Sequence, residues 1–317
     1  MQLLETVPNI SVGNNPPLLK QLADEVLRVA PVKILHVDPN DDAKRTVLTL
    51  VGQPNDIVNA CFALIQCAAE HIDMRAHVGA HPRLGATDVC PLVPLQSISL
   101  EETAQYAEQL AKRVGEELKI PVYLYEKNAR TKERQNLAFL RRGEYESLPE
   151  KLKTNPPDYG PKIYDKHVAK TGATVIGARN FLIAFNMSLN TKDVLIAKKI
   201  AAKLREKNGG LPAVKAIGWY MENYHCAQVS CNLTDFHQTG LSVLFEACKR
   251  EAAAYGLAVT AGELIGLIPQ DALLQAGQFY APHEKNEAAL INAAIENLKL
   301  SVITAFDPNK RILEQLL

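Results

Sequence analysis

The 317-residue sequence has no excess charge of either sign, since 35 lysine and arginine residues balance 35 aspartate and glutamate residues. Long-range attraction to nucleic acid or to an anionic membrane depends on such an excess, so the composition favours a small-molecule partner. The sequence also lacks apolar runs of membrane-spanning length, and its N-terminus lacks the basic and apolar regions of a secretory leader. We therefore expect a cytoplasmic protein that binds neither membrane nor nucleic acid.

Cysteine is scarce, and no two cysteines form the close CxxC pair that is typical of zinc sites. Most of the six lie within apolar runs, which favours buried free thiols in a reducing compartment over disulfides. Cys90, for example, follows an apolar pattern and is better explained as a core residue than as a nucleophile.

The length of the chain exceeds that of an ordinary single-core domain, so two units are expected. In the first, the patterns predict strands near 3–7, 32–37, 45–51 and 87–93, with helices that begin near Pro16 and Pro54. In the second, they predict strands near 181–187, 213–220, 226–233 and 257–259, with helices after Asn190 and over 240–255. Both read strand, helix, strand, strand, helix, strand. This order is typical of an α+β protein with two ferredoxin-like (split βαβ) subdomains, which we place at 1–178 and 179–317.

Residues 127–172 are the least regular part of the sequence. They contain a basic stretch between Arg130 and Arg142 and the turn-rich segment Asn155-Pro156-Pro157-Asp158-Tyr159-Gly160-Pro161. A loop of this length in a compact domain is usually functional or mobile.

The densest group of chemically active side chains lies between Arg75 and Asp88. Two histidines, two arginines, one aspartate and two glycines fall within these fourteen residues, between a helical pattern and a β-like apolar run. A rigid scaffold commonly displays catalytic groups on such a connection. We interpret this segment as the catalytic one.

Three segments, 81–91, 172–186 and 227–233, resemble glutamate formiminotransferases when taken together. The resemblance extends from the first predicted strand to Leu317 and so covers essentially the whole chain. It implies two ferredoxin-like subdomains with a substrate cleft between them, and a homodimer. It also implies transfer of a formimino group from N-formimino-L-glutamate to N5 of tetrahydrofolate in histidine degradation, with tetrahydrofolate as co-substrate and no metal.

The resemblance assigns catalysis to His81, which matches the catalytic histidine of the family. An imidazole with a pKa of about 6.5 can accept a proton and return it near neutral pH, as this transfer requires. Without the resemblance, a histidine before a proline would more often be a turn residue. The neighbouring His77 either orients His81 or is simply exposed.

Four further residues are predicted to bind substrate. Asp38 matches a family aspartate proposed to lie in the site, although an aspartate that ends a strand also suits an Asx turn. Arg75, Arg83 and Arg179 are placed to hold carboxylates, and a structural ion pair explains each arginine equally well.

The folate-contacting loop of the family corresponds to residues 160–172. This loop is longer and more basic than the animal pattern, and its lysines would attract the glutamate tail of folate, polyglutamylated or not. A solvated charge run is the alternative. The predicted folate-binding residues are Gly160, Pro161, Lys162, Tyr164, Lys166, His167, Lys170 and Gly172.

Two other functions remain open from the sequence. The same cleft and base would serve a folate-dependent formyl transferase or cyclo-ligase, although the sequence has no Walker-type phosphate loop for ATP. A non-catalytic folate-binding protein is the other alternative, and a full motif around His81 argues against it.

Overall fold

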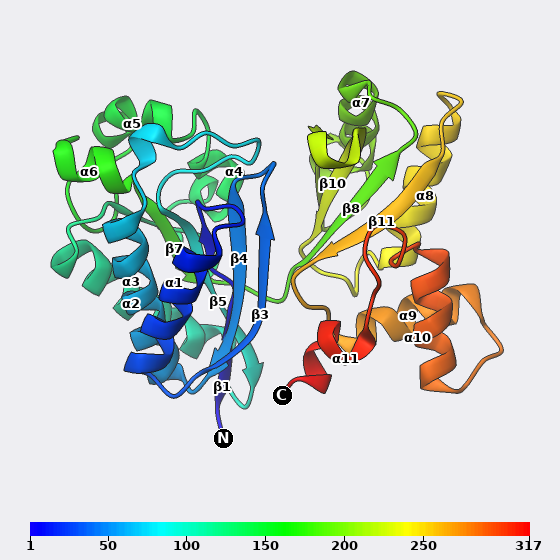
Figure 1. Ribbon diagram of the computed structural model, residues 1–317, viewed down its shortest axis with the longest axis horizontal. Coiled ribbons are helices and arrows are strands. Elements are labelled where there is room, and N and C mark those ends of the chain that lie inside the picture. The colour runs from blue at the N-terminus through cyan, green and yellow to red at the C-terminus, as the bar shows by residue number, and fades with distance from the viewer. The chain divides into compact units, whose positions relative to one another are not determined.

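A computed structural model describes residues 1–317, and the chain divides into two compact units, Met1–Asn180 and Phe181–Leu317. Each unit combines one β-sheet with several helices (Figure 1). The α+β class predicted from the sequence is confirmed. No helix has both the length and the apolar character needed to span a bilayer.

The first unit contains a seven-stranded sheet and six α-helices. Its strands are β1 (Leu3–Thr6), β2 (Asn9–Ile10), β3 (Lys33–Asn40), β4 (Arg45–Gly52), β5 (Thr87–Gln96), β6 (Val122–Leu124) and β7 (Thr174–Ala178). Its helices are α1 (Pro16–Val29), α2 (Pro54–His71), α3 (Leu100–Glu117), α4 (Leu137–Leu140), α5 (Leu148–Thr154) and α6 (Lys166–Thr171).

The central strands of this sheet are antiparallel. Strand β1 lies between β4 and β5, and β3 pairs with β4. Strands β7 and β6 then extend the sheet in parallel beyond β5. Strand β7, which completes this parallel extension, is not among the predicted strands.

Local sequence signals explain where the main helices begin. Ser99 and Glu102 form a capping box before α3: the Ser99 hydroxyl accepts from the Glu102 N–H at 3.1 Å, and the Glu102 carboxylate accepts from the Ser99 N–H at 2.8 Å. Two prolines stand at the start of α1, where a missing N–H costs nothing.

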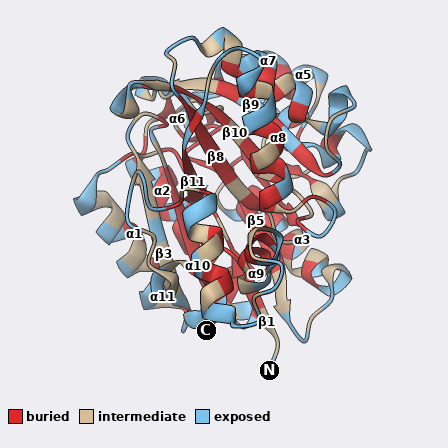
Figure 2. Cartoon of the chain, turned by 90° about the vertical axis from the view of Figure 1, so that its right-hand side faces the viewer, coloured by how far each residue is buried: buried red, intermediate tan, exposed pale blue.

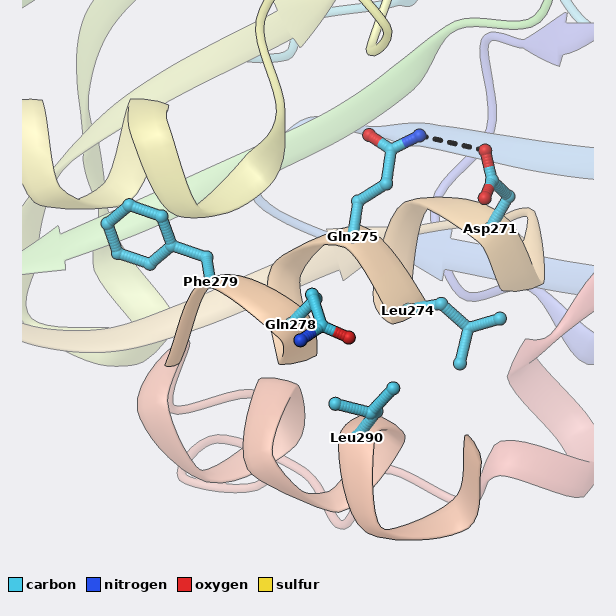
Figure 3. A pocket seen from close by; sticks show the side chains of 6 residues that line it. All are labelled: Asp271, Leu274, Gln275, Gln278, Phe279 and Leu290. Carbon is cyan, nitrogen blue, oxygen red and sulfur yellow. Dashed lines mark hydrogen bonds between the residues drawn. The ribbon is translucent and has the colours of Figure 1, made fainter. Parts of the chain in front are cut away.

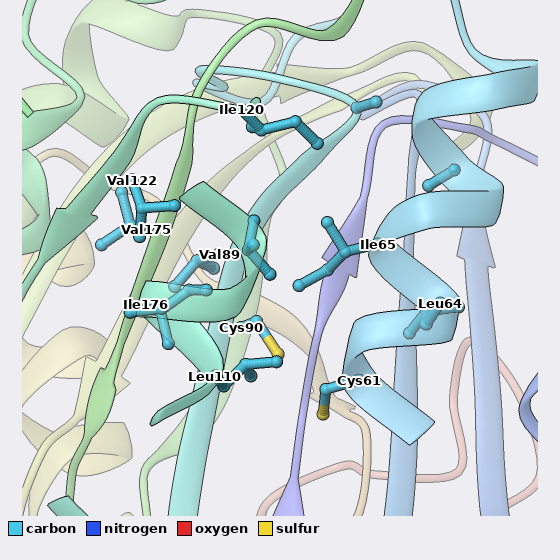
Figure 4. Close-up of a cluster of buried hydrophobic side chains, with 14 of the residues drawn as sticks. Cys61, Leu64, Ile65, Val89, Cys90, Leu110, Ile120, Val122, Val175 and Ile176 are labelled. Atoms are coloured by element: carbon cyan, nitrogen blue, oxygen red, sulfur yellow. The ribbon is translucent and has the colours of Figure 1, made fainter. Parts of the chain in front are cut away.

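The core of the first unit forms where α2 and α3 pack on the sheet. Figure 4 shows Cys61 of α2 and Cys90 of β5 within this cluster. Cys90 is fully buried, and its hydrogen bond with the Cys61 thiol, together with burial, raises its pKa well above the usual value. The thiol therefore belongs to the core, and all six cysteines are unpaired.

Residues 127–172 are more ordered than the sequence patterns predict. They form three short α-helices, α4 to α6, and two 3₁₀ turns, Glu133–Gln135 and Tyr145–Ser147. Buried polar contacts replace apolar periodicity here: Arg134 and Asp158 form an ion pair at 2.9 Å with side-chain exposures of only 10% and 9%. Such segments lack helical periodicity, so a prediction based on periodicity does not detect their helices.

The second unit contains a four-stranded antiparallel sheet in the order β11-β8-β10-β9. The strands are β8 (Ile183–Leu189), β9 (Val214–Met221), β10 (Cys226–Leu233) and β11 (Val259–Ile265). The helices are α7 (Val194–Leu204), α8 (Leu241–Ala253), α9 (Gln270–Tyr280), α10 (Glu287–Asn297) and α11 (Pro308–Arg311).

Helices α7 and α8 pack on the sheet of the second unit, and α9 packs on α8 and α10. Their buried residues recur at helical spacing and leave the opposite face exposed, as the mixed colours along α8 show (Figure 2). The N-cap of α7 is Asp193, whose carboxylate accepts from the Leu195 N–H at 2.8 Å. The helix predicted after Asn190 therefore begins a little later, at Val194, and the Thr191 hydroxyl accepts from the Asp193 N–H at 3.1 Å.

Candidate active site

The segment that carries His81 connects α2 to β5 and is fixed by backbone contacts. The Ala86 N–H donates to the Thr171 carbonyl at 2.8 Å, and the Ala80 N–H donates to the Asp42 carbonyl at 3.0 Å. The Ser11 hydroxyl also donates to the Gly85 carbonyl at 2.7 Å. The loop is thus held at both ends, as a loop that presents a reactive side chain requires.

His81 is half-buried, and its Nε2 contacts the guanidinium of Arg45 at 2.5 Å. A guanidinium has donors and no acceptor, so Nε2 must be the unprotonated, accepting nitrogen. Burial lowers the pKa of His81 well below its usual value, and the positive charges of Arg45 and Arg141 lower it further. The imidazole is therefore neutral near pH 7, which is the form that can act as a base.

Arg45 begins β4, directly after the hairpin that leads from β3. Arg45 pairs with Asn40 of β3, so the two side chains lie on the same face of the sheet. Asp38 precedes Asn40 by two residues on β3, and its side chain therefore lies on this face as well. Burial lowers the pKa of Arg45 to about 10, with Arg141 acting in the same direction and Asp88 and Asp38 opposing it. Its Nε is buried and has no hydrogen-bond partner.

Arg141 follows α4 and forms a buried ion pair with Asp88 of β5. Its Nε donates to Asp88 Oδ2 at 3.0 Å, and the side-chain exposures are 16% for Arg141 and 2% for Asp88. The other carboxylate oxygen of Asp88 accepts from the Leu84 N–H at 2.9 Å. Asp88 thus binds both the Arg141 guanidinium and the backbone of the loop that carries His81.

The sequence patterns do not predict the roles of Arg45 and Arg141. Arg141 appears in the sequence only as part of a basic stretch, and Arg45 as the polar end of a strand. One sequence feature could have indicated that Arg45 lies near Asp38. The short hairpin between these residues places their opposite charges on one face of the sheet.

Arg83 is held by acidic residues of its own unit. Its guanidinium donates to Glu144 at 2.8 Å and to both oxygens of Glu146 at 2.5 and 2.9 Å. Its Nε donates to His77 Nδ1 at 3.3 Å, and His77 Nε2 lies 3.0 Å from the Lys44 carbonyl. His77 therefore accepts at Nδ1 and donates from Nε2, and it links the Arg83 side chain to the backbone at Lys44.

Arg75 and Arg179 also make local contacts. Arg75 forms two hydrogen bonds with Asp73, at 2.5 and 2.8 Å. Arg179 donates to the Asn180 carbonyl at 2.9 Å. The structure therefore brings Asp38 close to the Arg45 and His81 pair, but it places Arg75, Arg83 and Arg179 in other contacts. Substrate binding by these four residues stays a prediction.

The predicted folate loop contains a short helix rather than an open loop. Asp165 caps α6 by accepting from the Val168 N–H at 2.9 Å. Gly160 and Gly172 flank the segment with φ values of +81° and +69°. Lys162 and Lys166 are exposed, and Pro161 is half-buried.

Three other side chains of this segment are fixed by contacts with neighbouring elements. His167 Nε2 lies 2.9 Å from the Leu118 carbonyl, and Lys170 donates to the Glu70 carbonyl at 2.7 Å. The Tyr164 hydroxyl lies 3.0 Å from that of Tyr145. Folate contact by any residue of this segment stays a prediction.

One face of the sheet in the second unit is polar. Gln228, Ser230 and Asn232 alternate along β10 and share this face, as expected from their spacing. The Gln228 amide donates to Ser188 at 3.1 Å and accepts from the Trp219 indole N–H at 3.1 Å. The buried Gln228 amide is therefore satisfied within the unit.

A separate hollow lies at α9 and α10 of the second unit (Figure 3). Its polar groups include Asp271 and Gln275, which hydrogen-bond to each other at 2.8 Å. It contains none of the residues predicted for catalysis or folate binding, and no group of three or more metal-ligating side chains occurs in the structure.

Comparison with known proteins decides the family. The model of the formiminotransferase domain, N-terminal subdomain, matches residues 3–179, and the model of the formiminotransferase domain matches residues 184–317. The chain belongs to the formiminotransferase family. The resemblance inferred from the three sequence segments is therefore confirmed.

Formiminotransferase relatives of two kinds match the chain. It is 43% identical to the formimidoyltransferase-cyclodeaminase of Mus musculus over 99% of its own length, but it spans only 60% of that protein. It is 43% identical to the glutamate formimidoyltransferase of Thermoplasma acidophilum, covering 88% of this chain and 92% of that protein. The glutamate formimidoyltransferase of Streptococcus pyogenes serotype M1 is 42% identical, with 88% and 93% covered.

Proposed function

We propose that the protein transfers the formimino group of N-formimino-L-glutamate to N5 of tetrahydrofolate, giving L-glutamate and 5-formiminotetrahydrofolate. The names of two relatives that the chain matches over most of their length support this reaction. The observation that carries the proposal is His81, a neutral imidazole held against Arg45 in the segment that the family resemblance marks as catalytic.

The reaction needs one group that accepts a proton and then returns it. N5 of tetrahydrofolate attacks the amidine carbon and loses its proton, and the departing glutamate nitrogen gains one. His81 supplies both steps, because the lowered pKa keeps the ring neutral before attack and makes its protonated form a ready acid. Acid and base catalysis of this kind contributes roughly 10²- to 10⁴-fold.

The two substrates are anionic, since formiminoglutamate has two carboxylates and folate carries a glutamate tail. Basic side chains of the first unit suit these groups, namely Arg45 next to His81 and the exposed Lys162 and Lys166. Tetrahydrofolate is then a co-substrate that leaves with the product. A cytoplasmic homodimer that needs no metal remains the expectation from the family.

The direct test is spectrophotometric detection of 5-formiminotetrahydrofolate from formiminoglutamate and tetrahydrofolate. We expect turnover by the wild type and a loss of about 10²-fold or more in His81→Ala. His283→Ala, which changes an exposed histidine of the second unit, serves as the matched control and should keep wild-type activity. Near-normal transfer by His81→Ala would refute its role.

The same assay separates the two alternatives. A formyl transferase or cyclo-ligase would act on 5-formyltetrahydrofolate with or without ATP and would ignore formiminoglutamate. A non-catalytic folate-binding protein would bind tetrahydrofolate in a calorimeter without turnover of either donor.

A further inference from the structure

We infer that Arg45 is a carboxylate-binding gate on His81: its guanidinium covers the Nε2 lone pair in the free protein, and a carboxylate of the amino-acid substrate draws it away. The inference deepens the proposed function and rests on it only for the identity of the substrate. It assigns two tasks to Arg45, binding of an anion and release of the base.

The first step of the argument concerns the lone pair. Arg45 Nη1 lies 2.5 Å from His81 Nε2, and His81 also has a backbone hydrogen bond with Pro82. A neutral imidazole has one accepting nitrogen, and Arg45 occupies it. His81 therefore cannot take a proton from a substrate until Arg45 moves.

The second step concerns what would move it. Arg75, Arg83 and Arg141 each form an ion pair with a carboxylate of the protein, whereas Arg45 forms none. One donor of Arg45 is used by a neutral imidazole, and its buried Nε has no partner. A carboxylate satisfies two guanidinium donors at once and binds more strongly than a neutral acceptor.

The third step concerns the surrounding charge. The groups that act on Arg45 are Arg141 after α4, Asp88 of β5 and Asp38 of β3. Asp88 is already paired with Arg141 and with the Leu84 N–H, so it does not compete for Arg45. Asp38 also attracts Arg45 electrostatically, but the two side chains form no ion pair.

Proton transfer then balances without any further reactant. A substrate carboxylate binds Arg45, and Nε2 becomes free. The N5 proton of tetrahydrofolate moves to Nε2 as the new bond to the amidine carbon forms. The same proton passes to the glutamate nitrogen as its bond to that carbon breaks, and the departing glutamate leaves Arg45 to return to His81.

The test is an NMR titration of the His81 imidazole in the full chain, with L-glutamate as the probe. In the wild type, glutamate should raise the His81 pKa, because the positive donor leaves Nε2 and a negative group arrives. Arg45→Gln should raise the His81 pKa in the absence of glutamate and should abolish the glutamate effect. Arg45→Lys, which keeps the charge but not the bidentate geometry, should retain part of it.

Arg28→Gln, at an exposed position of α1, is the matched control and should leave the titration unchanged. In kinetic assays Arg45→Gln should raise the KM for formiminoglutamate at least tenfold, while the KM for tetrahydrofolate changes little. The gate is overturned if millimolar glutamate leaves the wild-type His81 titration unchanged, or if Arg45→Gln responds to glutamate as the wild type does. Failure of the proposed function gives a different result. The wild type would then form no product in the transfer assay, but the His81 titration would still depend on Arg45 and glutamate.

Discussion

Gly85 and Gly172 pair through an antiparallel backbone bridge that joins the His81 segment to the residues before β7. A Cβ on Gly172 would lie 2.3 Å from the Leu84 carbonyl oxygen, and one on Gly85 would lie 2.4 Å from that of Ala173. Backbone atoms on both sides leave no flexible side chain to move aside. The predicted catalytic and folate segments thus meet at a contact that only two glycines permit.

We expect Gly172→Ala to destabilise the protein by about 3 kcal/mol, since its φ of +69° and ψ of −152° suit glycine alone and the added methyl group meets backbone. Urea denaturation measures this cost. Gly209→Ala is the control, because its φ is +85° and a Cβ would meet nothing within 4 Å. It should cost only about 1–2 kcal/mol. Equal costs at both positions would show that the contact between the glycines contributes nothing.

The sequence predicts the fold well where local patterns set it. The capping box at Ser99, the prolines in the first turns of α1 and α2 and the apolar patterns of the strands act over a few residues, so they can be read without the structure. Strand β7 and helices α4 to α6 could not be predicted in this way. Their order depends on pairing with β5 and on buried ion pairs such as Arg134 with Asp158.

The candidate site shows the same division. Motif resemblance marks His81 and Asp38, but the partner of His81 is Arg45, which lies 36 positions away in the sequence. Arg141 and Asp88 are separated by 53 positions. Such contacts follow from strand register and loop packing, which no local pattern encodes.

We expect the acidic limb of the kcat/KM profile for transfer to lie below pH 6.5. The base must be neutral in the free protein, and burial, Arg45 and Arg141 lower the His81 pKa, so protonation removes activity only at a more acidic pH. Folding stability should change in the same direction. Between the lowered pKa and about 6.5 the unfolded state binds more protons than the folded state, so stability falls as the pH falls through this window.

Profiles measured in buffers of constant ionic strength test this expectation. His81→Ala should flatten the part of the stability profile that lies below pH 6.5, because the titrating group is gone. An acidic limb centred at or above pH 6.5 would contradict the neutral, half-buried ring.

Asp88→Asn should destabilise the protein by about 3–5 kcal/mol, because it leaves the Arg141 cation buried without a counter-charge. The amide oxygen of the new asparagine can still accept from the Leu84 N–H, so the loss reports mainly on charge. The same change in an exposed pair, Asp24→Asn beside Lys20, should cost less than about 1 kcal/mol. Chemical denaturation compares the two, and a cost below about 1 kcal/mol for Asp88→Asn would rule out a structural role for the pair.

The lysines of the folate loop should differ in their effects. Lys162 and Lys166 are exposed, whereas Lys170 donates to the Glu70 carbonyl in the last turn of α2. If the loop attracts the folate tail, Lys162→Ala with Lys166→Ala should raise the KM for polyglutamylated tetrahydrofolate several-fold more than that for the monoglutamate. Added salt should reduce this difference, since exposed charges are screened over about 10 Å at 0.1 M ionic strength.

The control for the lysine pair is Lys198→Ala with Lys199→Ala on α7, which removes the same charge from two exposed positions of the second unit. It should leave both KM values unchanged. Lys170→Met should instead lower the free energy of unfolding by about 1 kcal/mol, because a carbonyl at a helix end loses its cationic partner. Equal KM changes from the 162/166 and 198/199 pairs would mean that net charge, and not the position of the loop lysines, attracts the folate tail.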